Sequence, residues 1–469
     1  MIKSHRIRLL AAFGPALLAA GTVAASASNA FASTATAQPE GQALFTTQGS
    51  VAPEFLAGAT TVPHWTFQYT DPLNHVTYPI TMVGTDPRVG GSTTVHTVII
   101  PLKMNFVAAG QDPSSLVNQG YGGFQPQFVN HTFDGTTKLA QTEVSPVFAD
   151  NGYPTDLGGG SGQLGDIYMR AQFNKRASDY HVKLDYTVAP TQTLDVPATK
   201  GIAYERPVSQ WRRTQQPPLQ TTADYTGLAE VNWFSTQLQS LMGSLQISPA
   251  TVPIFLTDNV LLYIKGTSLG YQNCCILGYH GASMPIGHGT GTINGQGKQG
   301  VQTFMYTAYV TPGTYSGFLT DYTGTRTAPR PTRGLSDIHA LSHEVSEFLD
   351  DPFTNNAVQP WIVASAPQYG CTRVLEVGDP VVGVWFGLNG NNLDARNSGM
   401  WHPEDEVFAQ WFGRGGIETA LTTSTWNGSS WDGRFTFMGP RTTSILVPVG
   451  NPPVLTAIYA AFSVYAQHC

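Results

Sequence analysis

The side chains best suited to chemistry lie close together in residues 334–352, GLSDIHALSHEVSEFLDDP. A helix over this segment, turning 100° per residue, presents four ionisable side chains on one face: His339, His343, Glu347 and Asp350. Donor groups four residues apart converge on one point above a helix, which is how paired side chains hold a metal ion. His343 and Glu347 therefore predict a metal site. Glu344 projects to the side of this row, where a carboxylate can accept a proton from an attacking water.

The helix that carries these groups has recognisable ends and an apolar face. Ser336 or Asp337 can cap its first turn, and Asp351 should end it because the residue before Pro352 resists the α conformation. The face opposite the ionisable groups is apolar: Ile338, Leu341, Val345, Phe348 and Leu349. The alternative interpretation is an amphipathic helix with a solvated polar face, but such faces usually include lysine and arginine. This face has neither, which favours a metal site.

The motif at residues 343–347, HEVSE, resembles the zincin metallopeptidase signature H-E-x-x-H with its second His replaced by Glu. The resemblance covers this helix and, loosely, the strand-rich region before it. It implies a divalent metal, zinc in that family, held by His343 and Glu347, with Glu344 as general base in the hydrolysis of a protein or peptide substrate. A carboxylate in place of the second imidazole lowers the Lewis acidity of the ion and admits harder ions such as Mn²⁺ or Ca²⁺.

A third metal ligand has to come from outside this helix. Resemblance to zincins with a downstream acidic ligand implies Glu376 or Asp379, which lie in the sequence VLEVGD at 374–379. The rival candidates are His402 and His339.

A second resemblance points away from an enzyme. The secreted phosphate-induced (exordium-like) family shares a pattern that is present here as Ser342–Glu347, Asp351-Pro352, Trp361 and Glu376–Asp379. That family is better known for extracellular signalling or wall-associated proteins than for enzymes. It implies a non-catalytic protein that binds glycan or another protein, and exposed aromatic residues such as Trp65, Trp211 and Trp431 would suit sugar stacking.

A glycoside hydrolase is the third possibility, because this reaction uses a pair of carboxylates. The acidic run Glu404-Asp405-Glu406 could supply them. Apolar Val407, Phe408 and Trp411 follow this run, so we interpret it instead as the solvated start of a helix.

The positions of strands and helices predict an α+β fold. A β-rich N-terminal region at 62–215 contains the clearest strands, and a zincin-like catalytic region at 219–469 holds a mixed sheet packed on the metal-site helix; Gln215–Pro218 is the expected boundary. The segments with strand character are Thr94–Phe106, His181–Val188, Val252–Leu256, Val260–Ile264 and Thr303–Val310. Leu228–Leu245 has the periodicity of an amphipathic helix.

The N-terminus has the pattern of a secretory signal peptide. Lys3, Arg6 and Arg8 precede an apolar stretch at 9–25, and the small-residue site Ala30-Phe31-Ala32 follows. We therefore expect residues 1–32 to be removed, residues 33–61 to form a flexible leader, and the mature chain to be secreted. No later segment has the run of about 18 apolar residues that a membrane span needs.

Four cysteines in an exported chain predict disulfide bonds. A bond between the adjacent residues Cys274 and Cys275 would close a strained ring. We therefore expect these two to reach separately to Cys371 and Cys469, in either pairing.

The charge balance excludes one class of partner. The chain has 24 Lys and Arg against 31 Asp and Glu, and charged residues make up only 12% of it. Nucleic-acid binding requires clustered basic side chains to neutralise phosphates. We therefore expect no nucleic-acid partner.

The signal peptide is directly testable. Secretion should leave a mature chain that begins at or near residue 33, because Ala30-Phe31-Ala32 fits the cleavage site. N-terminal sequencing of protein collected from the medium measures this, and a secreted chain that still begins at Met1 would contradict it.

Overall fold

The computed structural model describes the greater part of the chain. The described residues are 45–47, 50–108, 127–157, 159–175, 178–206, 224–264, 274–283, 292–293, 298–310, 337–362, 371–381, 385–393, 399–424, 426–438, 445–449 and 454–458. All of them belong to one compact unit, Ala37–Cys469. The expected signal peptide, 1–32, lies outside the described residues.

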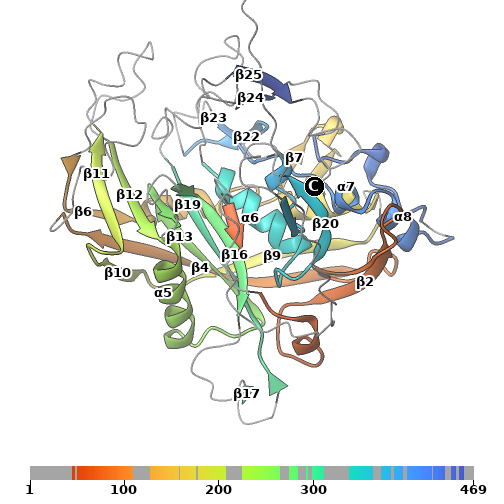
Figure 1. Cartoon of the computed structure of the whole chain (residues 1–469), viewed down its shortest axis with the longest axis horizontal. Coiled ribbons are helices and arrows are strands. Elements are labelled where there is room, and N and C mark those ends of the chain that lie inside the picture. The colour runs from red at the N-terminus through yellow and green to blue at the C-terminus, as the bar shows by residue number, and fades with distance from the viewer. Residues whose placement is uncertain are drawn as a thin grey trace, which may run out of the picture. The chain divides into compact units, whose positions relative to one another are not determined.

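A mixed sheet of eight strands forms the centre of this unit (Figure 1). Its order is β1 (Phe45–Thr47), β16 (Gly278–Ser283), β19 (Gln302–Tyr309), β13 (Thr251–Asp258), β4 (Ser92–Phe106) and β10 (Gln192–Val196), with β6 (His131–Asp134) and β9 (His181–Val188) also paired to β4. The long strand β4 runs parallel to β9, β10 and β13, whereas β16 runs antiparallel to β19. Helices accompany these strands, so the α+β class predicted from the sequence is confirmed.

Strands from both sequence regions join in this sheet. Ile99 of β4 lies opposite Ile254 of β13, so residues of 62–215 and 219–469 pair directly. The boundary expected at Gln215–Pro218 lies outside the described residues. The strand pairing makes the two regions parts of one sheet.

Two helices lie against opposite faces of this sheet. Neighbouring residues of β4 and β13 alternate between two buried cores, with Ile254 in the core of α6 (His339–Asp350) and Phe255 in the core of α5 (Val231–Ser244). This alternation follows from the two-residue period of a strand, and it explains why each strand contains a continuous apolar run, at residues 98–102 of β4 and 252–256 of β13.

The structure also contains a second sheet, which has five strands. Its order is β15 (Cys274–Ile276), β14 (Val260–Tyr263), β12 (Asp224–Glu230), β11 (Gly201–Arg206) and β5 (Gln127–Phe128). Two-stranded pairs complete the β structure: β2 (His64–Thr70) with β3 (Thr77–Val83), β7 (Asn151–Tyr153) with β8 (Gly160–Gly162), β17 (Thr292–Ile293) with β18 (Lys298–Gln299), β20 (Ala357–Ile362) with β21 (Cys371–Val374), β22 (Leu388–Asn391) with β23 (Gly399–Trp401), and β24 (Ile445–Val449) with β25 (Val454–Ile458).

The remaining described helices are α2 (Leu139–Glu143), α3 (Leu164–Gln172), α7 (Ala409–Gly413) and α8 (Gly416–Leu421). The described 3₁₀ turns are η1 (Pro53–Phe55), η2 (Gly135–Lys138), η3 (Thr155–Leu157), η8 (Asp379–Val381) and η10 (Trp431–Gly433).

The strand predictions are confirmed, while two helix starts are corrected. The helix expected from Leu228 begins at Val231, because Glu230 ends strand β12 and its carboxylate accepts the first helical N–H groups. Helix α6 ends at Asp350, as the following Asp-Pro pair predicts. Its N-cap is Ile338, with no side-chain cap hydrogen bond. Asp337 does not cap it, and Ser336 lies outside the described residues.

The later part of the expected leader is packed against the fold. Val51 and Leu56 are buried, and the Val51 backbone N–H donates to the Phe353 carbonyl oxygen. This part of 33–61 is therefore ordered by core contacts. None of the helices in the described part of the chain has the length and apolarity that crossing a bilayer requires.

Cys371 forms a disulfide bond. The side chains of Cys274 and Cys275, and the whole of Cys469, lie outside the described residues. We predict that non-reducing peptide mapping will join Cys371 to Cys274 or Cys275. The closed loop would span roughly 100 residues, so its removal in Cys371→Ser should cost about 2–5 kcal/mol of unfolding free energy. A mapped chain with a free Cys371 thiol would contradict this prediction.

Candidate metal centre

Helix α6 carries its ionisable groups inside the protein. It packs against β16 and β19 of the central sheet (Figure 1), and every one of its residues is buried. The interpretation of its polar face as a solvated surface is therefore wrong. Buried carboxylates are expensive unless a positive charge or hydrogen bonds compensate them.

Three of the predicted ligands meet at one point beside this helix. His343 Nε2 lies 3.0 Å from Glu347 Oε1 and 3.9 Å from Asp379 Oδ1. Asp379 opens the 3₁₀ turn η8, shortly after strand β21. The Gly378 backbone N–H donates to Glu347 Oε1 at 3.2 Å, which fixes the loop against the helix. All three side chains are buried and could hold a metal ion between them.

A carboxylate orients the imidazole of this group. His343 Nδ1 lies 2.7 Å from Glu404 Oε2, so Nδ1–H donates to the carboxylate and Nε2 faces Glu347. Glu404 is held in turn by its backbone N–H, which donates to Ser342 Oγ at 2.9 Å. A carboxylate behind a histidine fixes the tautomer and raises the basicity of the nitrogen that binds a metal.

A second group of donors lies on the side of α6 that faces β16. His280 Nδ1 is 3.4 Å from Glu344 Oε2 and 3.6 Å from Glu347 Oε2. These three side chains are also buried and could hold an ion. Glu347 thus belongs to both groups, and the predicted base Glu344 lies beside His280.

The other candidate ligands have different partners. Glu376 shares a hydrogen bond with Glu347, and burial followed by the charge of Glu347 raises its pKa well above its usual range. Glu376 therefore lies beside the ligand Glu347, and Asp379 completes the group. His339 Nε2 lies 3.1 Å from Glu404 Oε2, and His402 Nδ1 lies 3.0 Å from Asp337 Oδ2.

Asp350 also lies outside the metal groups, although it shares the predicted face. Its Oδ1 accepts from Gln172 Nε2 at 2.6 Å, and burial raises its pKa to about 7.

Sequence reasoning missed His280 as a metal donor and misjudged the acidic run at 404–406. Glu404, Asp405 and Glu406 are at most 2% exposed, so they do not form a solvated helix start. Helix α7 begins only at Ala409. The signal that could have identified the run is the absence of lysine and arginine around three acids that precede apolar residues. His280 in GYHG offered no comparable signal.

In the group of His343, Glu347 and Asp379, burial and the charges of neighbouring side chains shift the pKa values of His343 and Glu347 in opposite directions. Burial lowers the pKa of His343, but the carboxylates of Glu347 and Glu404 outweigh it and leave that pKa well above its usual range. Burial raises the pKa of Glu347, but the charge of His343 outweighs it and leaves the pKa below its usual range. A positive charge is therefore strongly favoured between these side chains.

The second group behaves differently because it lacks such compensation. Burial raises the pKa of Glu344 well above its usual range, and the charge of Glu347 raises it further. Burial lowers the pKa of His280 to about 4, so its imidazole is neutral at pH 7.

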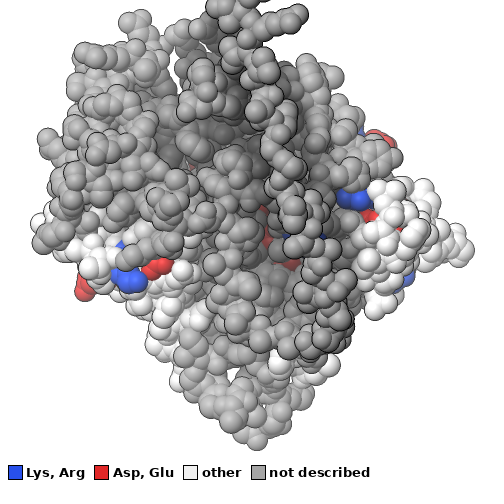
Figure 2. Space-filling model, viewed as in Figure 1, with Lys and Arg blue, Asp and Glu red and all other residues white. Residues whose placement is uncertain are grey.

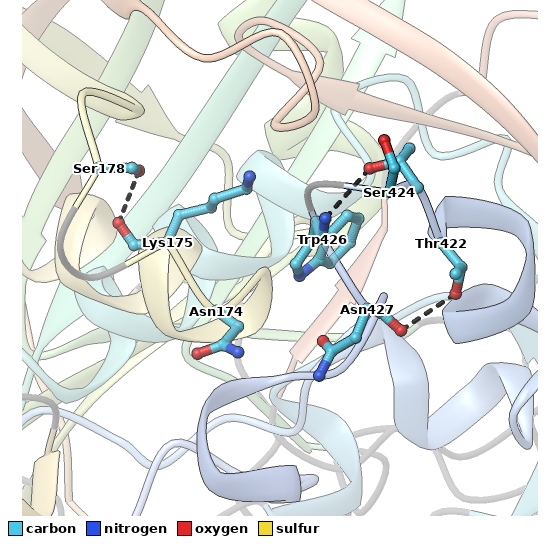
Figure 3. Close-up of a pocket in the computed structure, with 8 residues that line it drawn as sticks. Asn174, Lys175, Ser178, Thr422, Ser424, Trp426 and Asn427 are labelled. Carbon is cyan, nitrogen blue, oxygen red and sulfur yellow. Dashed lines mark hydrogen bonds between the residues drawn. The ribbon is translucent and has the colours of Figure 1, made fainter.

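A separate surface cavity of about 620 Å³ lies elsewhere on the chain. Figure 3 shows Asn174, Lys175 and Asn427 around Trp426, with the Lys175 ammonium 5.5 Å from the centre of the indole ring. Trp426 is buried, so its ring face is not open for sugar stacking.

Two of the three tryptophans expected to bind glycan are not exposed. Trp65 and Trp431 are buried, and Trp211 lies outside the described residues. Charged side chains are sparse among the described atoms in Figure 2, in keeping with the 12% charged composition.

No family model, curated protein or solved structure matches the chain. One imidazole and two carboxylates, all buried and oriented by neighbours, fit a divalent cation.

Gly378 provides a test of this arrangement. A Cβ at this position would lie 2.4 Å from Nδ1 and Cε1 of His343, so Gly378→Ala should displace the imidazole. We expect Zn²⁺ affinity to fall about 10–100-fold, the loss typical when the orientation of a ligand is disturbed. Competition with a chromophoric chelator measures it. Gly152→Ala is the matched control, because nothing lies within 4 Å of its Cβ. Equal affinity in both variants would contradict the site.

Proposed function

We propose that the chain is a secreted metal-dependent hydrolase, a metallopeptidase, that uses zinc. The observation that carries this proposal is the convergence of His343 Nε2, Glu347 Oε1 and Asp379 Oδ1, with Glu404 behind the imidazole. Catalytic zinc is typically held by three protein ligands, and this group supplies three, with a carboxylate in place of one of the histidines of the His₂Glu set.

The side chains of the site have distinct roles in this proposal. A zinc ion held by His343, Glu347 and Asp379 would polarise a scissile carbonyl and increase the acidity of a water molecule. Glu404 keeps the imidazole in the tautomer that presents Nε2. With a cation in place to favour its ionised form, Glu344 would accept the proton of the attacking water, and both of its oxygens lack a hydrogen-bond partner among the described residues.

The position of Glu344 supports this role. It follows His343 directly in the chain, and its side chain lies beside Glu347 but outside the first donor group. Gly278 of β16 makes room for it, because a Cβ there would lie 2.6 Å from Glu344 Oε1. The carboxylate of Glu344 is therefore held in place by packing, while no hydrogen-bond donor of the described residues occupies its oxygens.

A structural metal site is the second candidate, and one observation favours it. His343, Glu344 and Glu347 are 0% exposed, as ligands of a structural ion usually are. This candidate agrees with the resemblance to the exordium-like family. It predicts stoichiometric metal and a metal-dependent fold without hydrolysis.

Glu344→Gln separates the two candidates. The amide keeps the shape of the side chain but cannot accept a proton, so hydrolysis should fall by about 10²–10⁴-fold while the zinc held by His343, Glu347 and Asp379 stays bound. His343→Ala should lose that zinc and activity together. Activity on a broad peptide library, metal content and thermal unfolding of each purified variant measure these effects.

Glu143→Gln on helix α2 is the control for the same chemical change outside both donor groups. Full activity in Glu344→Gln would remove the general-base assignment. Full zinc content in His343→Ala would remove the metal site itself. Zinc without any hydrolysis in the native chain would favour the structural role.

A further inference from the structure

The carboxylate of Glu347 lies between two imidazoles. Its Oε1 is 3.0 Å from His343 Nε2, and its Oε2 is 3.6 Å from His280 Nδ1. Glu344 Oε2 lies 3.4 Å from the same His280 nitrogen. The two donor groups are thus adjacent and share one residue, whose two oxygens face opposite groups.

The hydrogen bonding of His280 leaves one nitrogen for a ligand. Its Nε2 lies 3.1 Å from the backbone oxygen of Asp351, and a carbonyl oxygen can only accept, so Nε2 carries the hydrogen. Nδ1 then presents a lone pair toward Glu344 and Glu347. This nitrogen is buried and has no hydrogen-bond partner within the described part of the chain. Histidines that bind a metal through one nitrogen usually donate the other N–H to a backbone carbonyl or a carboxylate, and the hydrogen bond of His280 has this arrangement.

The strand is shaped to bring Glu344 to this nitrogen. Gly278 and His280 are two residues apart on β16, so they lie on the same face, toward α6. The missing side chain at Gly278 leaves the space that Glu344 occupies. Among the described residues, no lysine or arginine pairs with Glu344 or Glu347, whose Oε2 also lacks a hydrogen-bond partner.

We propose that His280, Glu344 and Glu347 form a second divalent-cation site that is separate from the first and shares Glu347 with it. Glu344, Glu347 and Asp379 carry three negative charges when ionised, so a single dication leaves one charge uncompensated. In two-metal sites the ions lie about 3.5–4 Å apart, a separation that one carboxylate can bridge.

The second site has a functional consequence that rests on the proposed hydrolase activity. An ion at this site takes Glu344 as a ligand, and a coordinated carboxylate cannot accept the proton of the attacking water. Filling the second site should therefore inhibit hydrolysis by about 10²–10⁴-fold, the factor expected when a general base is lost. Activity should rise with the first equivalent of metal and fall with the second.

The test is a zinc titration of the full secreted chain after chelator treatment, read by equilibrium dialysis and metal analysis. We expect two equivalents in the native chain and one in His280→Gln, whose amide can still donate to the Asp351 carbonyl. His280→Gln should weaken binding of the second zinc equivalent by more than about 100-fold, because loss of a residue that only supports a ligand already costs about 10–100-fold in metal affinity. His402→Gln is the matched control, because His402 is buried but belongs to neither donor group, and it should keep both equivalents.

A second variant guards against misfolding of His280→Gln, which near-ultraviolet circular dichroism would reveal. In Gly278→Ala the added methyl group would displace the Glu344 carboxylate, so this variant should also weaken the binding of the second zinc equivalent only. A native chain that binds one equivalent, lost in His343→Ala and kept in His280→Gln, overturns the second site and leaves the hydrolase proposal intact. A chain that binds two equivalents in the expected way but cleaves no peptide supports the second site and overturns the hydrolase.

Discussion

The buried imidazole of His343 is the contact on which the arrangement of the site depends. Carboxylates lie on both sides of it, Glu404 at 2.7 Å from Nδ1 and Glu347 at 3.0 Å from Nε2. These groups come from α6 and from the segment that follows β23, and the loop with Gly378 closes over the same ring. A buried charge without a partner costs several kcal/mol, so each segment is held where its charge is compensated. Apolar side chains of the core pack around these charged groups.

The central sheet explains how a buried polar cluster can coexist with a continuous apolar core. Strand β16 alternates, so Tyr279 points toward α5, where its hydroxyl meets Ser235, while His280 points toward α6. Gly278 and Gly378 lie against Glu344 and His343, where any side chain would collide with them. Small residues at these two positions are therefore part of the polar site, because they let backbone approach the ionisable groups closely.

The sequence predicts the elements of this protein better than their assembly. Apolar runs identified β13 and β19, and the helical period of 334–352 placed His343 and Glu347 together, because both signals are local. Glu404 is 57 residues beyond Glu347, and no local period relates it to the helix. Its burial follows from pairing with His343, which only the fold brings about. His280 was missed for the same reason: a single histidine in a strand carries chemistry only if the opposite face supplies carboxylates.

The protonation of the cluster links metal binding to folding. Burial raises the pKa of Glu344, Glu376 and Glu406 well above the usual range, so these groups hold protons in the folded chain at a pH where the unfolded chain has released them. The folded chain then binds more protons than the unfolded one, and its stability falls as pH rises above the ordinary carboxylate pKa. A divalent cation favours the ionised carboxylates and opposes that loss, because it replaces protons as the source of positive charge. Burial thus destabilises the ionised carboxylates, and for the same reason it favours binding of a cation that compensates their charge, whether the ion serves catalysis or structure.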